Sequence, residues 1–73
     1  MDLNQYLSVL EILEKDGAVV ILKWDGERSR NKKTIVVSKP GTDYHFRADT
    51  DELESAIESA VLDYHNSFNV VAG

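Results

Sequence analysis

Two short runs of β-branched and apolar residues most constrain the fold of this chain. The first run is AVVILKW at positions 18 to 24, and the second is TIVVS at positions 34 to 38. β-Branched side chains lose rotamer freedom in a helix but pack well on a pleated surface, so both runs predict strands. A third segment, DYHFRA at 43 to 48, alternates polar and apolar residues, which is typical of a strand with one buried face. The centre of the chain therefore predicts a three-stranded sheet.

The segments on either side of these strands have helical periodicity. Asp2 and Gln5 have the spacing of a capping box, and Gly17 stands where a helix commonly ends. Asp49 and Glu52 predict a second capping box. Apolar residues recur at intervals of three and four in both segments, as Leu3, Tyr6, Leu7, Leu10 and Leu13 and then as Leu53, Ile57, Val61, Tyr64 and Phe68. The prediction is an α+β fold of order α-β-β-β-α, a three-stranded antiparallel meander packed against two helices.

The whole chain predicts one small domain over residues 1–73, with residues 69–73 as a frayed tail. It contains no cysteine, which excludes disulfides and thiolate metal sites. Because small secreted domains commonly depend on disulfides, we expect a cytoplasmic protein. The N-terminus lacks the basic and apolar regions of a signal peptide. The longest apolar run, AVVIL, is far too short to span a bilayer, so we expect no membrane partner.

Two connections set the predicted strand register. The segment KPGT at 39–42 predicts a tight type II turn, which would place Val37 near Tyr44. The segment WDGERSRNKK at 24–33 contains an Asp-Gly pair that is typical of a two-residue turn, but that turn would pair an apolar strand with a polar one. A longer loop over residues 26–31 instead brings 19–21 opposite 35–37, and the hydrophobic pattern favours it.

Charge is distributed in three blocks along an acidic chain of net charge −5. The balance is −4 over residues 1–27, +5 over residues 28–47 and −6 over residues 48–73. The acidic flanks could pack around the basic centre, or the molecule could present two faces of opposite charge that each steer a partner. The basic loop holds four of the eight basic side chains: Arg28, Arg30, Lys32 and Lys33.

Two surfaces are candidates for binding a protein partner or a second copy of the chain. If both helices cover the same face of the sheet, the other face keeps an apolar patch, because the first two strands do not alternate. The residues predicted for that patch are Val20, Leu22, Trp24 and Val36. A helix on each face, or coverage by residues 69–73, would remove it. The second candidate is an acidic face of the C-terminal helix, with Asp51, Glu54 and Glu58.

The sequence predicts no catalytic residue, no metal site and no cofactor. Neither His45 nor His65 is paired with a recognisable nucleophile, and no paired-histidine zinc signature or phosphate-binding glycine motif occurs. Glu54 and Glu58 lie four residues apart, as ligands of a metal could, but a solvated helix face accounts for that spacing.

The α-β-β-β-α order is similar to that of the double-stranded RNA-binding domain, and the resemblance covers topology alone. It implies that the basic loop and the start of the second helix would meet a duplex. The family has a lysine-rich motif at that helix start, where this chain has Asp49, Asp51, Glu52 and Glu54, which would repel phosphates. We therefore expect a small acidic, non-enzymatic protein-interaction module, of the kind that inhibits or regulates a larger partner. The alternative is nucleic-acid binding through loop 28–33.

Overall fold

The structure is a computed structural model, and it describes residues 2–68. The elements are α1 (Leu3–Lys15), β1 (Val19–Trp24), β2 (Lys33–Ser38), β3 (His45–Thr50) and α2 (Leu53–Phe68). The predicted α+β class and the α-β-β-β-α order are confirmed. The expectation of a frayed tail at residues 69–73 lies outside the described residues.

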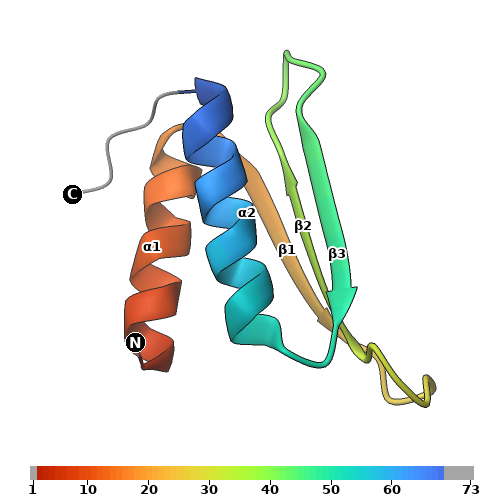
Figure 1. The fold of residues 1–73 in the computed structure, drawn as a ribbon. Helices are drawn as coiled ribbons and strands as arrows, with labels where there is room; N and C mark the ends of the chain where they lie inside the picture. The colour runs from red at the N-terminus through yellow and green to blue at the C-terminus, as the bar shows by residue number, and fades with distance from the viewer. Residues whose placement is uncertain (1, 69–73) are drawn as a thin grey trace.

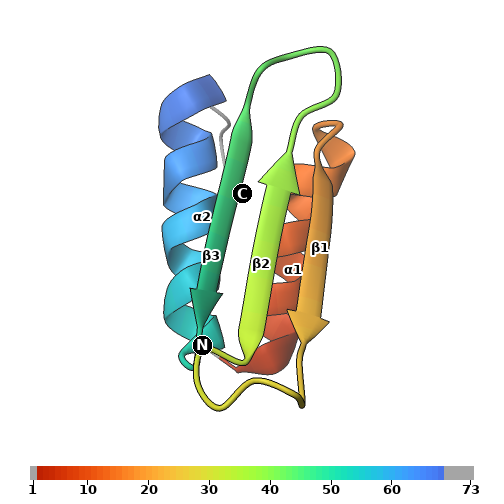
Figure 2. The same ribbon diagram turned by 90° about the vertical axis from the view of Figure 1, so that its right-hand side faces the viewer.

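The molecule has two layers, a sheet and a pair of helices (Figures 1 and 2). The strand order is β1-β2-β3 and both pairings are antiparallel, so the sheet is a meander with β2 at its centre. Both helices lie on the same face of the sheet, α1 over β1 and α2 over β2 and β3. The opposite face of the sheet is therefore not covered by either helix.

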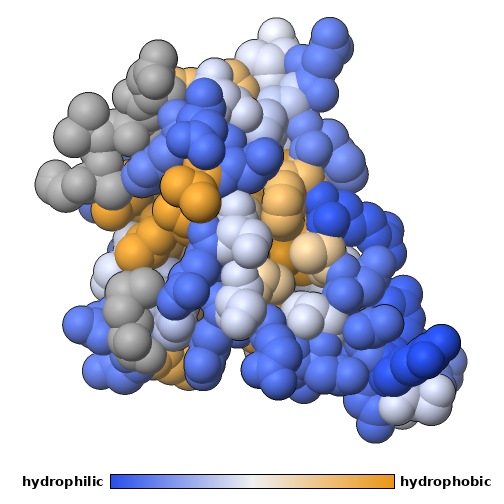
Figure 3. Space-filling model, in the orientation of Figure 1, coloured by the Kyte–Doolittle hydropathy of each residue, from blue (hydrophilic) through white to orange (hydrophobic). Residues whose placement is uncertain are grey.

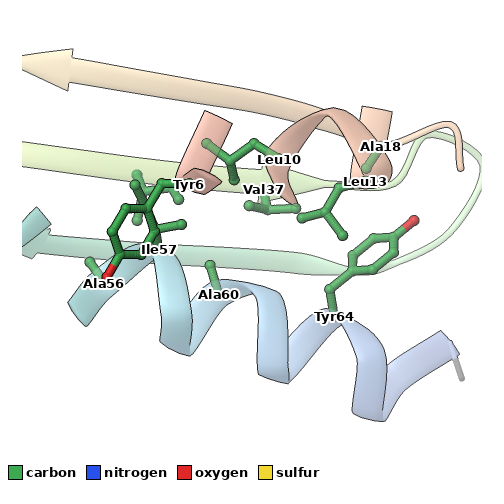
Figure 4. Close-up of a cluster of buried hydrophobic side chains, with 10 residues drawn as sticks. Tyr6, Leu10, Leu13, Ala18, Val37, Ala56, Ile57, Ala60 and Tyr64 are labelled. Atoms are coloured by element: carbon green, nitrogen blue, oxygen red, sulfur yellow. The ribbon is translucent and has the colours of Figure 1, made fainter. Parts of the chain in front are cut away.

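The core lies between these two layers. Central strand β2 contributes Ile35 and Val37, which are both fully buried. Ala56 and Ala60 on α2 are small, which lets backbones approach closely enough for the larger side chains to interdigitate. The rest of the buried apolar cluster, most of which Figure 4 shows, consists of Tyr6, Leu10, Leu13, Ala18, Ile57 and Tyr64.

The predicted beginning and end of α1 are confirmed. The Asp2 carboxylate accepts a hydrogen bond of 3.0 Å from the Gln5 backbone, and the Gln5 side chain accepts one of 2.8 Å from the Asp2 backbone. Gly17, just beyond the helix, has a φ of +95°, a conformation that costs glycine no side-chain clash.

The predicted capping box of α2 is wrong. Asp49 lies within β3, and the hydroxyl of Thr50 accepts a hydrogen bond of 2.8 Å from the Glu52 backbone just before the helix. The carboxylate of Asp49 instead accepts hydrogen bonds from Thr34 on the neighbouring strand and from Arg28. These long-range contacts extend β3 through Asp49 and delay the start of the helix to Leu53.

The turn between β2 and β3 is confirmed, but its predicted register is two residues off. Gly41 has a φ of +85°, and a hydrogen bond of 3.1 Å closes the turn around the Pro-Gly pair. Val37 pairs with Phe46 rather than with Tyr44. The ring of Tyr44 packs edge-on against that of Tyr64, with 5.4 Å between centroids. Tyr44 is therefore placed by α2, and the strand begins after it.

Candidate functional site

Strand β1 is an open edge of the sheet, because within residues 2–68 it pairs with β2 alone. The backbone N–H of Asp25 donates to the carbonyl of Lys32 at 2.7 Å, and antiparallel strands alternate between pairs that exchange hydrogen bonds and pairs that do not. In this register, the N–H and C=O groups of Val20, Leu22 and Trp24 point away from β2. This edge can therefore accept a further strand.

A groove of about 610 Å³ runs along the same edge, between α1 and β1. Its floor is apolar, and two carboxylates, those of Glu11 and Glu14, lie on its α1 side. Both glutamates are exposed. The other lining residues are Leu7, Leu10, Ala18, Val19, Val20 and Leu22. The groove thus combines an apolar floor with negative charge along one wall.

Four of the six exposed large hydrophobic side chains of residues 2–68 lie at this edge. Five of the six lie on α1 or β1, and only Leu62 lies on α2. Leu3, at the start of α1, lies instead beside the start of α2. We use the term β1-edge surface for the groove together with the other four side chains, which are Leu7, Val19, Ile21 and Trp24. Trp24 is 61% exposed and Ile21 is 54% exposed. The projecting β1–β2 loop, at the lower right of Figure 3, is by contrast mostly hydrophilic.

The four residues predicted to form the apolar patch do not share one face. The longer β1–β2 loop is confirmed, but the register differs by one residue from the expected one, since Ile21 pairs with Val36 and Leu22 with Ile35. A shift of one residue exchanges the two faces of a strand. Val36 therefore lies on the uncovered face with Val19 and Ile21.

The remaining three predicted patch residues, on the other side of β1, differ in exposure. Val20 and Leu22 pack against the core under α1. Trp24 follows the same alternation, but it lies at the end of the strand and stays exposed. Both helices do lie on one face of the sheet, and the apolar residues on the uncovered face are Val19 and Ile21 beside Val36, in place of the predicted Val20, Leu22 and Trp24.

The predicted acidic face of α2 is only partly free, because two of its three carboxylates bind other parts of the chain. Asp51 accepts backbone hydrogen bonds from Asn31 at 2.9 Å and from Lys32 at 3.1 Å, and these bonds lower the pKa of its carboxyl group. Glu58 accepts the hydroxyl hydrogen of Tyr6 at 2.8 Å. That bond raises the pKa of the tyrosine. Glu54, in the first turn of α2, is exposed.

The basic loop is anchored to the acidic strand end rather than open. Arg28 lies 3.3 Å from the carboxylate of Asp25 and 3.1 Å from that of Asp49. Hydrogen bonds from Thr34, Arg47 and Arg28 hold the pKa of Asp49 well below its ordinary value.

The other predicted loop residues are less enclosed. Arg30 and Lys32 are exposed, and Lys33 is half-buried opposite Trp24. The three blocks of charge in the sequence thus meet within the chain, which supports the interpretation that the flanks pack around the basic centre.

Sequence reasoning missed a polar cluster at the opposite end of the molecule. Lys39 donates to the carboxylate of Asp16 at 2.8 Å and to its backbone carbonyl, and the hydroxyl of Tyr64 donates to the same carboxylate at 2.6 Å. The hydrogen bond from Lys39, with that from Tyr64, lowers the pKa of Asp16. These contacts join the end of α1, the β2–β3 hairpin and α2, and no local sequence signal links three residues so far apart.

Residues 2–68 hold no group of three or more histidine, cysteine or acidic side chains placed to bind a metal ion. Neither described helix is both long enough and apolar enough to cross a membrane. Within the described part of the chain, the features with clear binding geometry are therefore the β1-edge surface and the charged groups around the loop.

Comparison of the chain with protein-family models, with curated proteins and with solved structures finds no significant match in any of the three.

Proposed function

We propose that this chain is a small, acidic, non-enzymatic protein-interaction module of the cytoplasm that binds and regulates a larger protein through the β1-edge surface. One observation carries the proposal: four of the six exposed large hydrophobic side chains in residues 2–68, those of Leu7, Val19, Ile21 and Trp24, lie at the β1 edge. Apolar side chains that gather beside a groove and an unpaired strand are typical of a protein-binding surface.

The energetics favour this surface over the charged ones. Burial of apolar area contributes about 25 cal/mol per Å², whereas an exposed ion pair contributes about 1 kcal/mol at most. Trp24 offers the largest exposed ring on this edge, and tryptophan is enriched among residues that dominate binding energy. Asp49 and Asp51, by contrast, are already engaged by the chain's own loop.

A photo-crosslinking amino acid placed at Ile21 tests the proposal. The matched control places the same group at Leu62, which is at least as exposed (63% against 54%) but lies on α2. Irradiation in extract of the native host should give a specific adduct from the Ile21 variant and none from the Leu62 variant. Identical adducts from both positions, or no adduct from either, would contradict the proposal.

The sole tryptophan supplies a second readout that needs no label. Because Trp24 is exposed, its emission should shift to shorter wavelength when a purified partner covers the edge. A partner that cross-links at Ile21 but leaves the emission unchanged would restrict the surface to the uncovered sheet face.

A further inference from the structure

We infer that the partner contributes an extended segment that pairs with β1 as a fourth strand, and that this segment carries basic side chains toward α1. The inference rests on the proposed function and deepens it, because it names both the mode of binding and the chemistry of the bound segment. Addition of a strand to an open sheet edge gains affinity from main-chain hydrogen bonds and specificity from alternate side chains.

The two edges of the sheet differ in how they are protected against such pairing. Edge strand β3 exposes His45, Arg47 and Asp49, and charged side chains on an edge oppose strand addition. Strand β1 has the sequence VVILKW, so Lys23 is its only charge. The Lys23 ammonium lies 3.6 Å from the carboxylate of Asp25, near the loop. Strand β1 is therefore the edge that can accept a further strand.

The groove determines which side chains suit the added strand on the helix side. Alternate residues of that strand would point between α1 and β1, over Leu7 and Leu10 and toward Glu11 and Glu14. A lysine or arginine fits both features, since its methylene stem can lie on the apolar floor while its charged end reaches the carboxylates.

On the other side, the intervening residues of the added strand would lie beside Val19 and Ile21 on the uncovered face. β-Branched apolar side chains fit that position because they pack well across neighbouring strands. The segment that the geometry points to is therefore one in which valine-like and lysine-like residues alternate.

Charge distinguishes such a partner from a second copy of this chain. Antiparallel pairing of two β1 strands about a two-fold axis places both α1 helices on the same face of the joined sheet. Glu11 and Glu14 of both copies would then line the same junction, between two molecules of net charge −5 each. A basic segment avoids this repulsion and is attracted by the whole molecule.

Nuclear magnetic resonance with synthetic peptides tests the inference on the full chain. The probe is a capped peptide of about seven residues that alternates valine and lysine, which is close to the common length of a strand. The matched peptide alternates valine and glutamate. The valine–lysine peptide should slow amide exchange at Val20, Leu22 and Trp24 but not at His45 or Arg47. Binding of both peptides with equal affinity, or protection at β3, would overturn the inference.

Variants of the chain test the two parts of the inference separately, namely recognition of basic side chains by the groove and strand pairing with β1. Glu11→Gln with Glu14→Gln should weaken binding of the valine–lysine peptide about threefold to tenfold at low salt, since two exposed ion pairs are lost. The control, Glu52→Gln with Glu54→Gln, makes the same change in net charge at the start of α2 and should leave affinity nearly unchanged. Equal effects of the two pairs would show that only net charge matters, and would overturn the role assigned to the groove.

Total synthesis of this 73-residue chain allows a backbone ester to replace a single amide. An ester at Leu22 removes a donor that faces the edge and removes no donor of the pairing with β2, while the Ile21 carbonyl becomes a weaker acceptor in that pairing. The Arg47 ester weakens the Phe46 carbonyl in its pairing with β2 in the same way and so controls for this effect. The Leu22 ester should weaken binding of the valine–lysine peptide about threefold to tenfold, whereas an ester at Arg47, on the edge of β3, should leave it unchanged. No effect of the Leu22 ester would overturn strand pairing.

The outcomes distinguish this inference from the proposed function. Suppose that the cross-linking experiment gives an adduct at Ile21 but no peptide protects the β1 amides. This result would support the proposed function and overturn the inference that the partner pairs with β1 as a strand. Failure of both experiments would contradict both. A dimeric mass in analytical ultracentrifugation with β1 amides already protected would assign the edge to a second copy. Stronger peptide binding by a chain ending at Phe68 would assign it to the chain's own residues 69–73.

Discussion

The guanidinium of Arg28 and the carboxylate of Asp49 lie 3.1 Å apart, although the two residues are 21 positions apart in the chain. Arg28 belongs to the loop between β1 and β2, and Asp49 lies near the end of β3. The loop that projects furthest from the sheet in Figure 1 is thereby fastened to the strand that leads into α2. A segment that seems a free basic tip in the sequence is thus part of the folded structure.

We expect Asp51→Ala to loosen this loop. The change removes the acceptor of the Asn31 and Lys32 amide hydrogens, so exchange at these two amides should accelerate about tenfold or more. Hydrogen exchange followed by nuclear magnetic resonance measures this directly. Glu54→Ala, a nearby change on the exposed side of α2, serves as the control and should leave both rates within a factor of about two. Unchanged exchange in Asp51→Ala would contradict the anchoring.

Acid should destabilise the protein through Asp49. Its pKa is lowered by hydrogen bonds from Thr34, Arg47 and Arg28, so the unfolded chain takes up the proton first as the pH falls. The stabilisation is present above the ordinary value of 3.8 and is lost as the pH falls from there toward the folded pKa. Asp49→Asn should be less stable than the natural chain at pH 7, and the difference should shrink below pH 3.8.

Urea denaturation at a series of pH values measures the effect of Asp49→Asn. Asp43→Asn removes one carboxylate from the exposed β2–β3 loop and provides the control for net charge. A difference between Asp49→Asn and the natural chain that stays constant down to the most acidic point would contradict the linkage. The Asp16, Asp25 and Asp51 carboxyls have lowered pKa values and should add to the acid sensitivity of every variant that retains them.

Tyr64→Phe should destabilise the fold by about 1 kcal/mol, because the buried ring keeps its packing but its hydroxyl no longer donates to Asp16. Tyr44→Phe removes a comparable bond to Asp63 at a more exposed position and should cost less. Chemical denaturation of the two variants decides the order. A larger loss for Tyr44→Phe would show that the cluster of Asp16, Lys39 and Tyr64 contributes little.

Ile57→Ala should cost about 2 to 5 kcal/mol of unfolding free energy, because the residue is 2% exposed and lies between the helices and the sheet. Leu62→Ala changes the same helix at a position that is 63% exposed, and its effect should stay within about 0.5 kcal/mol. Thermal or urea unfolding of both proteins tests the placement of the core. Similar losses at both sites would contradict the arrangement in Figure 4.

We expect no salt-sensitive binding of duplex RNA or DNA by the natural chain. Arg28 is engaged by two carboxylates, and Asp49 and Asp51 lie beside the loop, where they would repel phosphates. A gel-shift assay at low salt is the measurement. A shift that Arg28→Glu with Arg30→Glu abolishes would contradict this expectation and would favour the nucleic-acid interpretation of the loop.

The sequence predicts every element of this fold because the helices have helical periodicity, β3 alternates, and β1 and β2 are short runs rich in β-branched residues. It fails where only the tertiary arrangement decides. The apolar runs of β1 and β2 are continuous, so the pattern selects a long loop but cannot select between registers that differ by one residue. The predicted patch therefore grouped Val36 with Val20, whereas in the structure Val36 pairs with Ile21.

The error at Asp49 has a different physical origin. An aspartate three residues before a glutamate is a sound local signal for the start of a helix. Here the hydrogen bonds from Thr34 and Arg28 hold this aspartate in β3, and neither partner is local in sequence. The site was likewise only partly predictable, since the groove depends on how α1 lies along β1.

The unequal edges of the sheet have a consequence for the size of any assembly. Under the proposed binding through β1, a molecule that joins by this strand presents its charged β3 strand to the next molecule. We therefore expect growth to stop after a single junction, without stacking of many copies into a fibre or bridging of two partners through the sheet. A module bound through β1 would form the outer edge of the joined sheet. A regulator of this kind would bind with a stoichiometry of one module for each partner strand.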